Sequence, residues 1–263
     1  MRILLIAVGT RGDVQPFLAL SKTLKARGHS PTLVAGENFR AWIEGEGIAF
    51  EDAGVDFEAL MNSPEGLALS GKVSKNPLND AKGMRRITAV HGAKMAARFW
   101  ELGQGYDAYL SGLISFPLVE AMAERTGRPH VSLLLAPFFP TADPRRAILA
   151  PIKAGASALN RWVGELTLYG LWWIFGPTTQ AFRAQIGLPP SGYLDFVRQV
   201  KGRPHLGGYS PLLAPHIQQG REDVVVTGSW RLEESAPWTP PPALVEFLEA
   251  GFLLVYVGFG SMF

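Results

Sequence analysis

The feature that most constrains the fold is an apolar run, a glycine turn and a helical pattern that follow one another at the amino terminus. The residues from Ile3 to Val8 are continuously apolar, which is typical of a strand buried on both faces of a parallel sheet. The turn Gly9–Gly12 follows, and apolar residues then recur at helical spacing between Val14 and Leu24. Ligands of open α/β sheets bind beyond the carboxyl ends of the strands, so this turn is a natural binding site.

Strand and helix patterns continue to alternate along the chain. This alternation predicts an α/β fold, a Rossmann-like doubly wound and mainly parallel sheet with helices on both faces. The expected strands are Ile3–Val8, Thr32–Ala35, Ile48–Phe50, Tyr106–Leu110 and His130–Leu135, with weaker candidates at His205–Gly207 and Val224–Val226. The expected helices are Val14–Ala26, Phe39–Glu44, Asp80–Leu102, Pro117–Arg125 and a largely helical Arg145–Gln185 that is interrupted near Gly176–Pro177. Asn62–Asn79, rich in Gly, Ser, Pro, Asn and Lys, is predicted as a loop or broken helix.

The amino-acid composition of the chain excludes several classes of function. The 263 residues are 47% hydrophobic, which suffices for one substantial core, or one domain and a linker. A net charge of only +2 gives no electrostatic reason to expect a nucleic-acid partner. Without cysteine there is no disulfide or thiol chemistry, and no histidine pair has metal-ligand spacing, so no metal site is expected. The chain shows neither a signal peptide nor about twenty consecutive apolar residues, which predicts a cytoplasmic protein.

Four stretches resemble a single protein family. G-T-R-G-D-V-Q-P-F-L-A-L, residues 9–20, resembles the amino-terminal signature of the two-domain GT-B glycosyltransferases. The nearest branch holds sterol glucosyltransferases and the glycosyltransferases of glycopeptide and macrolide antibiotics. V-V-T-G-S-W at 225–230 resembles the close of that family's first domain, and P-A-L-V-E-F-L at 242–248 its interdomain linker. V-Y-V-G-F-G-S-M at 255–262 resembles the first strand and loop of its second domain.

The resemblance implies a domain plan and an activity. Residues 1–232 would form the acceptor-binding Rossmann-like domain, 233–251 the linker, and 252–263 the first strand and loop of a donor-binding domain. The run Pro240–Pro242 favours a stiff, extended linker. The implied reaction is inverting transfer from a UDP- or dTDP-sugar to a hydroxyl of a lipophilic sterol, polyketide, glycopeptide or lipid, with no metal or other cofactor.

The second-domain donor motif of this family is absent from the chain. That motif is a His-Gly-Gly or His-Cys-Gly segment, and neither occurs here. The chain alone is therefore expected to bind acceptor with little or no transfer, and to need a separate carboxy-terminal half. The rival function is a non-catalytic module that binds a hydrophobic ligand or a partner.

Asp13 is the candidate general base. Glycosyl transfer removes a proton from the attacking hydroxyl, and a carboxylate within hydrogen-bond reach does this best when burial raises its pKa. The alternative is a helix N-cap, for which aspartate is among the preferred residues and is worth about 1 kcal/mol. Residue type and position alone favour the cap, whereas the resemblance favours the base. The roles conflict, because hydrogen bonds from backbone amides lower the pKa of a capping carboxylate.

The turn residues Thr10, Arg11 and Gly12 are expected to contact the acceptor, although plain turn chemistry explains the glycines equally. The turn lacks the G-x-G-x-x-G pattern, so a dinucleotide site is disfavoured even though Glu37 lies near the position such a site uses.

Two further segments are candidate ligand contacts. The loop with Pro137, Phe138 and Phe139 is predicted to line an apolar acceptor pocket, with ordinary loop packing as the alternative. Gly260 and Ser261 resemble the loop that faces the donor diphosphate, where backbone amides and a hydroxyl suit phosphate oxygens, with a frayed terminus as the alternative.

A tryptophan-rich segment from Trp162 to Phe175 is apolar but too short to span a bilayer. Packing as a core helix is the favoured interpretation. The alternatives are an acceptor tunnel and peripheral membrane contact, where tryptophan is favoured at the interface. Basic residues that could face anionic lipid are Lys72, Lys75, Lys82, Arg85 and Arg86. His91 could reach the acceptor site, but a surface or core position is the ordinary expectation.

Overall fold

The computed structural model describes residues 1–61, 77–137, 139–144, 151–212, 223–233, 239–251, 255 and 257. The strands are β1 (Arg2–Ile6), β2 (Ser30–Ala35), β3 (Ala49–Asp52), β4 (Ala108–Ser111), β5 (His130–Leu134), β6 (His205–Gly207) and β7 (Val224–Val226). Within the described residues they form one sheet in the order β3-β2-β1-β4-β5-β6-β7, with every pair parallel. The predicted strands and the parallel fold class are therefore confirmed, the weak candidates included.

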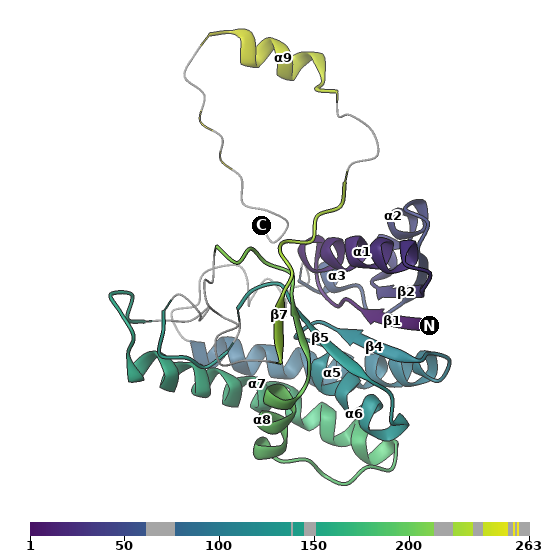
Figure 1. Ribbon diagram of the computed structural model, residues 1–263, viewed down its shortest axis with the longest axis vertical. Coiled ribbons are helices and arrows are strands. Elements are labelled where there is room, and N and C mark those ends of the chain that lie inside the picture. The colour runs from purple at the N-terminus through teal and green to yellow at the C-terminus, as the bar shows by residue number, and fades with distance from the viewer. Residues whose placement is uncertain are drawn as a thin grey trace.

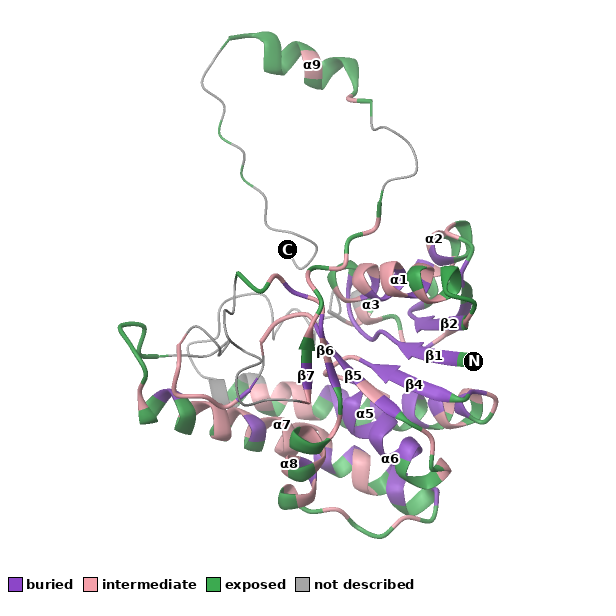
Figure 2. Ribbon diagram, viewed as in Figure 1, coloured by how far each residue is buried: buried purple, intermediate pink, exposed green. Residues whose placement is uncertain are grey.

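Helices cover both faces of this sheet (Figure 1). The helices are α1 (Arg11–Ala26), α2 (Arg40–Gly45), α3 (Phe57–Met61), α5 (Pro77–Gly103), α6 (Phe116–Thr126), α7 (Ala158–Gln185), α8 (Tyr193–Gly202) and α9 (Pro242–Glu249), with a 3-10 turn at Glu37–Phe39. One face carries α1 and α2, and the other carries α5, α6 and α7. Figure 2 shows that the buried residues concentrate in the strands between these layers.

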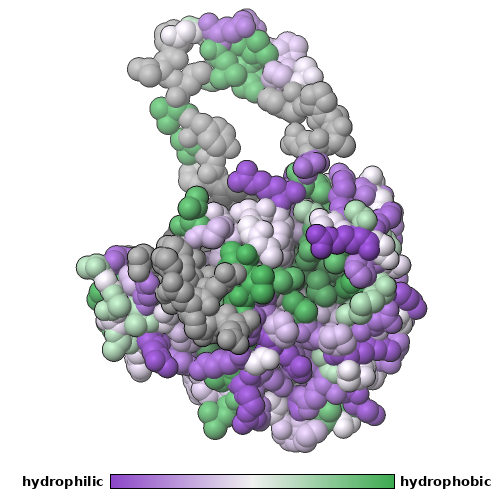
Figure 3. Space-filling view, viewed as in Figure 1, coloured by the Kyte–Doolittle hydropathy of each residue, from purple (hydrophilic) through white to green (hydrophobic). Residues whose placement is uncertain are grey.

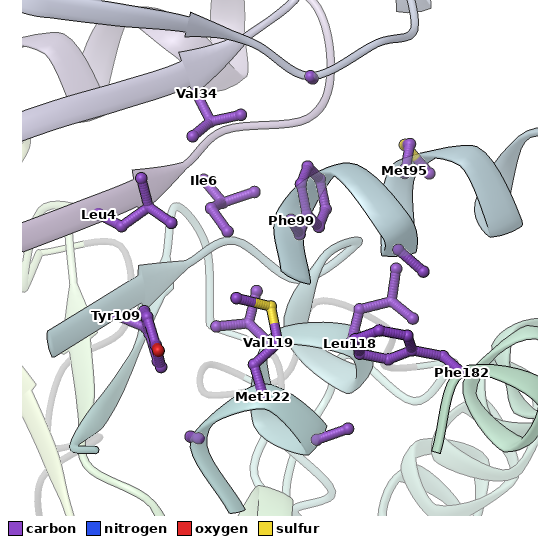
Figure 4. Close-up of a cluster of buried hydrophobic side chains, with 14 of the residues drawn as sticks. Leu4, Ile6, Val34, Met95, Phe99, Tyr109, Leu118, Val119, Met122 and Phe182 are labelled. Atoms are coloured by element: carbon purple, nitrogen blue, oxygen red, sulfur yellow. The ribbon is translucent and has the colours of Figure 1, made fainter. Parts of the chain in front are cut away.

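Alternation along β1 divides the core in two. Ile3 and Leu5 face α1 and pack with Phe17, whereas Leu4 and Ile6 face the opposite layer, where Phe99 of α5 lies against the sheet (Figure 4). All six side chains are buried. A strand that is apolar at every position is thus explained by helices on both of its sides.

The first helix begins earlier than the sequence pattern indicated. It starts at Arg11 rather than near Val14, and Thr10, not Asp13, is the N-cap residue. Asp13 is the third residue of the helix, and its carboxylate accepts a hydrogen bond from the backbone N–H of Thr10 at 2.9 Å. This is a capping box, in which an acidic residue three positions after the cap satisfies the amide of the cap. The prediction of Asp13 as the N-cap was wrong by three residues.

Helix α7 runs without interruption through Gly176 and Pro177, contrary to the expected break. Proline lacks the N–H that would donate to the carbonyl four residues earlier, here that of Trp173. The Arg85 guanidinium of α5 supplies the missing donor at 2.7 Å and lies over the Trp173 ring. A contact between two helices therefore replaces the lost backbone bond.

The remaining boundaries differ in detail. Of the expected loop at 62–79, residues 62–76 lie outside the described residues, and 77–79 already belong to α5. The helices α3, α8 and α9 were not predicted. Helix α9 begins at Pro242 within the expected extended linker, because proline suits a first helical turn. Figure 1 shows α9 apart from the two helical layers, and Figure 3 shows hydrophobic side chains exposed along it. The first strand and loop of a second domain, expected at 252–263, lie mainly outside the described residues.

Candidate active site at the switch point of the sheet

The strand order reverses between β1 and β4, so the turns after these two strands leave the sheet side by side. Ile6 pairs with Ser111, and the N–H of Gly112 donates to the Ile6 carbonyl at 3.3 Å. The Ser115 hydroxyl also donates to that carbonyl, at 3.2 Å. The two turns that meet here are the Gly9–Asp13 turn and residues 112–115.

In the first of these turns, the Asp13 carboxylate lies close to the backbone of Gly9. Gly9 has φ +152°, and a Cβ added to it would lie 2.0 Å from Asp13 Oδ2. Only glycine leaves room for the carboxylate at this distance from the chain. The other oxygen, Oδ1, hydrogen-bonds to no residue that the structure describes. The side chain is half-buried, neither sealed in the core nor fully in water.

Burial raises the pKa of the Asp13 carboxyl above its ordinary value, although the hydrogen bond from the Thr10 amide acts in the opposite direction. Asp195 in α8 provides a comparison, since it accepts the same capping bond from the Gly192 N–H, also at 2.9 Å. There the backbone bond, together with Arg198, lowers the pKa. Two carboxylates with the same capping bond thus have opposite pKa shifts, because Asp13 is more buried and Asp195 has Arg198 as a partner. Capping therefore does not exclude Asp13 as a base.

The other candidate residues near Asp13 differ in their exposure and in their contacts. Thr10 is buried as the N-cap, and Gly12 is exposed in the first turn of the helix. Arg11 is exposed, with its guanidinium 4.9 Å from the centre of the Trp42 ring. Glu37 pairs with Arg40 at 2.5 Å. The turn thus gathers Thr10, Gly12 and Asp13 at one edge, while Glu37 is engaged in an ion pair.

A cavity of about 400 Å³ opens on the other side of the switch point. Its walls come from α5, α6 and α7, from Leu113 and Ile114 in the turn after β4, and from Val55 and Phe57 after β3. The lining is almost wholly apolar, which suits a lipophilic ligand of drug-like size. A Cβ on Gly112 would lie 3.4 Å from the Phe17 ring of α1, so the cavity's β4 turn and the Asp13 helix adjoin.

His91 of α5 also lines this cavity, whereas a surface or core position was the expectation. The sequence signal was a lone histidine in a helical pattern, which does not distinguish the three positions. The other contribution that sequence reasoning missed is α5 itself, which provides Met84, Ile87 and Met95 to the wall.

Phe139, in the loop predicted to line the acceptor pocket, does not line the large cavity. Phe139 is buried beside His205, with ring centres 5.2 Å apart, and packs with Tyr209 and Val224 rather than in the large cavity. Pro137 is half-buried, and Phe138 lies outside the described residues. The donor candidates Gly260 and Ser261 also lie outside them. The structure therefore brings Thr10, Gly12 and Asp13 together, and it places Phe139 in a smaller cavity that shares Leu113 and Phe175 with the large one. A contact between Phe139 and the acceptor stays a prediction.

A buried polar network lies under the site. His130 Nδ1 is 2.8 Å from Glu120, His130 Nε2 is 2.7 Å from the Ser111 hydroxyl, and Arg203 donates to the other oxygen of Glu120 at 2.7 Å. Burial raises the pKa of Glu120, but the hydrogen bonds from His130 and Arg203 outweigh it and leave the pKa lowered. The order Ser-His-Glu resembles a hydrolase triad, yet Ser111 is 0% exposed, so no substrate reaches its hydroxyl. The network therefore stabilises the junction of β4, β5 and α6.

The outer face of α7 does not pack in the core, so the favoured interpretation of the tryptophan-rich segment was wrong for this face. Its exposed residues are Leu159, Trp162, Leu166 and Tyr169, with Trp162 61% exposed. The inner face, with Leu171, Ile174 and Phe175, lines the cavity. No helix among the described residues combines the length and hydrophobicity that crossing a bilayer requires. The described residues also contain no cluster of three acidic or histidine side chains that could hold a metal ion.

Residues 3–113, which include β1, Asp13 and β4, match the glycosyltransferase family 28 N-terminal domain. This part of the chain is similar to glycosyltransferase N-terminal domains. It contains both strands of the switch point, β1 and β4, and much of the cavity wall. The resemblance seen in the first residues of the sequence is thereby confirmed.

Named relatives extend the similarity beyond this domain. The chain is 29% identical over 273 residues to a sterol 3-beta-glucosyltransferase of Cryptococcus neoformans, covering 100% of this chain and 17% of that protein. It is 29% identical over 277 residues to the O-mycaminosyltylonolide 6-deoxyallosyltransferase of Streptomyces fradiae, covering 99% and 61%. The chain thus spans only part of the length of these relatives.

Solved structures show the same fold. The calicheamicin glycosyltransferase CalG4 superposes with a TM-score of 0.52 at 18% identity, covering 92% of this chain and 56% of that one. The kitacinnamycin glycosyltransferase gives 0.51 at 18% identity, covering 92% and 55%. The chain therefore shares the Rossmann-like architecture of these GT-B glycosyltransferases.

Proposed function

We propose that this chain is the acceptor-binding half of an inverting glycosyltransferase that moves a sugar from a UDP- or dTDP-sugar to a hydroxyl of a lipophilic acceptor. The observation that carries the proposal is the Asp13 carboxyl at the switch point, half-buried, raised in pKa and with one oxygen unpartnered among the described residues. The named relatives, which are sterol and macrolide glycosyltransferases, support the substrate classes.

The proposed reaction uses Asp13 as the general base. The acceptor lies in the cavity with its hydroxyl at Asp13 Oδ1, which takes the proton as the acceptor oxygen bonds to the anomeric carbon of the sugar. The nucleoside diphosphate leaves from the opposite side with the electron pair of the broken bond, which inverts the configuration. The raised pKa supports this role because a base works best when its pKa approaches the working pH.

Acceptor binding and donor binding belong to different domains, as inferred from the sequence. Residues 1–232 hold the acceptor, and Trp230 and Leu232 pack against the sheet core, which supports that boundary. Residues 233–251 link to a donor-binding domain that begins with 252–263, where Gly260 and Ser261 face the diphosphate. Stabilisation of the leaving group belongs to that domain. The chain alone binds acceptor and transfers little or no sugar.

Peripheral membrane contact is the remaining part of the proposal. The outer face of α7 exposes Trp162 and Tyr169, side chains that favour the membrane interface. Lys153 and Arg161 are exposed near its amino-terminal end and form no ion pair with any described residue. Such cations attract anionic lipid. Because the same helix lines the cavity, it would connect a lipid surface with the acceptor site.

The test compares Asp13→Asn with Asp195→Asn. Each variant keeps a side-chain oxygen for the capping bond, so the fold is retained in both. With the carboxy-terminal half supplied, Asp13→Asn lowers kcat/KM about 10²–10⁴-fold without weakening acceptor binding, and Asp195→Asn leaves turnover unchanged. Equal turnover by the two variants would contradict the proposal and favour a non-catalytic module that binds hydrophobic ligands, a function that the apolar cavity would also serve.

A further inference from the structure

We infer that His91 recognises a hydrogen-bonding group on the ligand of the cavity, so that the site selects a molecule that is apolar along its body and polar where it meets α5. This inference rests on the proposed role of the cavity as the acceptor site. It assigns to His91 a part in specificity that is separate from the role of Asp13. The argument depends on which polar groups of the lining are still available to a ligand.

The hydroxyls of the lining have already donated their protons. Thr88 donates to the carbonyl of Met84 at 2.8 Å, Thr178 donates to the carbonyl of Thr88 at 3.2 Å, and Thr179 donates to that of Phe175 at 3.0 Å. The backbone amides of α5 and α7 along the wall are used within the helices. None of these groups is a free donor for a ligand.

His91 is in the opposite situation. Its imidazole lines the cavity, is half-buried, and hydrogen-bonds to no residue that the structure describes. A neutral imidazole offers one N–H donor and one nitrogen acceptor, so it can pair with a hydroxyl or a carbonyl. A wholly apolar ligand would cover the ring without replacing its contacts with water, which disfavours such a ligand.

The position of His91 is fixed by its neighbour in the sequence. A Cβ on Gly92 would lie 2.5 Å from Thr178 Cγ2, so the absence of a side chain lets α5 and α7 approach closely at this point. The Thr178–Thr88 hydrogen bond joins the two helices in the same region. The imidazole is therefore carried on a packed helix pair rather than on a loop, as a selective contact requires.

The pattern limits the class of ligand. Among the described residues of the lining, His91 is the ionisable one, and the others are apolar or carry hydroxyls whose protons are used. An acceptor with many polar groups would leave most of them unpaired in the cavity, at a cost for each. An acceptor with a hydrocarbon body and a hydroxyl or carbonyl at His91 meets the available contacts.

The experiment measures binding of a matched pair of probes, 5α-androstan-3β-ol and 5α-androstane-3β,17β-diol, by equilibrium dialysis against the full chain. The diol keeps one hydroxyl for His91 when the other lies at Asp13. The ratio of their dissociation constants reports the preference for the second hydroxyl. His91→Phe is expected to reduce this ratio about fivefold, the typical value of one hydrogen bond between neutral groups. His91→Gln, which keeps a donor and an acceptor, retains most of the preference. Thr167→Val, which removes a hydroxyl of α7 that donates to the Val163 carbonyl and does not line the cavity, leaves the ratio unchanged.

The outcomes separate the two proposals. A hydroxyl preference that survives His91→Phe but is lost in Asp13→Asn would overturn the role of His91 while supporting the acceptor site. Failure of the wild-type chain to bind either probe would overturn both. Loss of preference in His91→Phe and in Thr167→Val alike would show a general disturbance of the helix pair and would also overturn the role of His91.

Discussion

The glycines of the first turn provide the sharpest test of how the Asp13 site is built, because two that lie three residues apart should respond with opposite signs. Gly9→Ala places a methyl group 2.0 Å from Asp13 Oδ2 and forces a non-glycine residue to φ +152°. Gly12→Ala adds a methyl whose nearest neighbour is Thr10 Oγ1 at 3.9 Å, in a helical backbone.

The magnitudes follow from these contacts. For Gly9→Ala, backbone strain of about 1–3 kcal/mol is added to loss of the capping bond, worth about 1 kcal/mol. The expected destabilisation is therefore about 2–4 kcal/mol. For Gly12→Ala, replacing glycine in a helix stabilises by about 0.5–1 kcal/mol.

Urea denaturation followed by circular dichroism measures both free energies of unfolding. Gly9→Ala should lower the urea concentration at the midpoint of unfolding, and Gly12→Ala should raise it slightly. The m-values of the two variants should equal that of the wild-type chain. Gly9→Ala should also weaken transfer by the reconstituted enzyme, because the carboxylate has to move. A neutral Gly9→Ala variant, or equal effects of the two substitutions, would refute the close approach of Gly9 and Asp13.

Glu120→Gln should lower the free energy of unfolding by about 3–5 kcal/mol, because it breaks a buried charged network. Folding lowers the pKa of Glu120, so its carboxylate stabilises the fold fully above the unfolded pKa of about 4.3, and this stabilisation is lost as the pH falls through the folded pKa. The stability of the variant should therefore not show this fall in acid. Gly92→Ala should weaken steroid binding, and Thr178→Ser, which removes the clashing methyl, should restore it. Trp162→Ser should reduce cosedimentation with phosphatidylglycerol vesicles, whereas Val90→Ser on another exposed surface should not.

Much of the fold could be predicted because its signals are local. The apolar run at β1, the alternation of strands and helices, and the helical spacing after the first turn each depend on neighbouring residues. The start of α1 could also have been found, since Thr10 and Asp13 have the spacing of a capping box, which places the cap at the threonine.

The rest depends on contacts between distant segments, which spacing does not show. Continuity of α7 through Pro177 needs Arg85, which lies about ninety residues earlier in the chain, to satisfy the freed carbonyl. The Ser111–His130–Glu120 network joins two strands and a helix. Helical pattern likewise could not distinguish the exposed face of α7 from its cavity face, because both faces are apolar.

The most direct test of the account is a carbon-13 NMR titration of the Asp13 carboxyl in the chain, with and without bound 5α-androstan-3β-ol, using Asp195 as an internal comparison. The account predicts that Asp13 titrates above the ordinary aspartate value of about 3.9, that Asp195 titrates below it, and that the alcohol perturbs only Asp13. An Asp13 resonance that titrates at or below the ordinary value and is unchanged when the alcohol binds would contradict its role as the base that faces the acceptor.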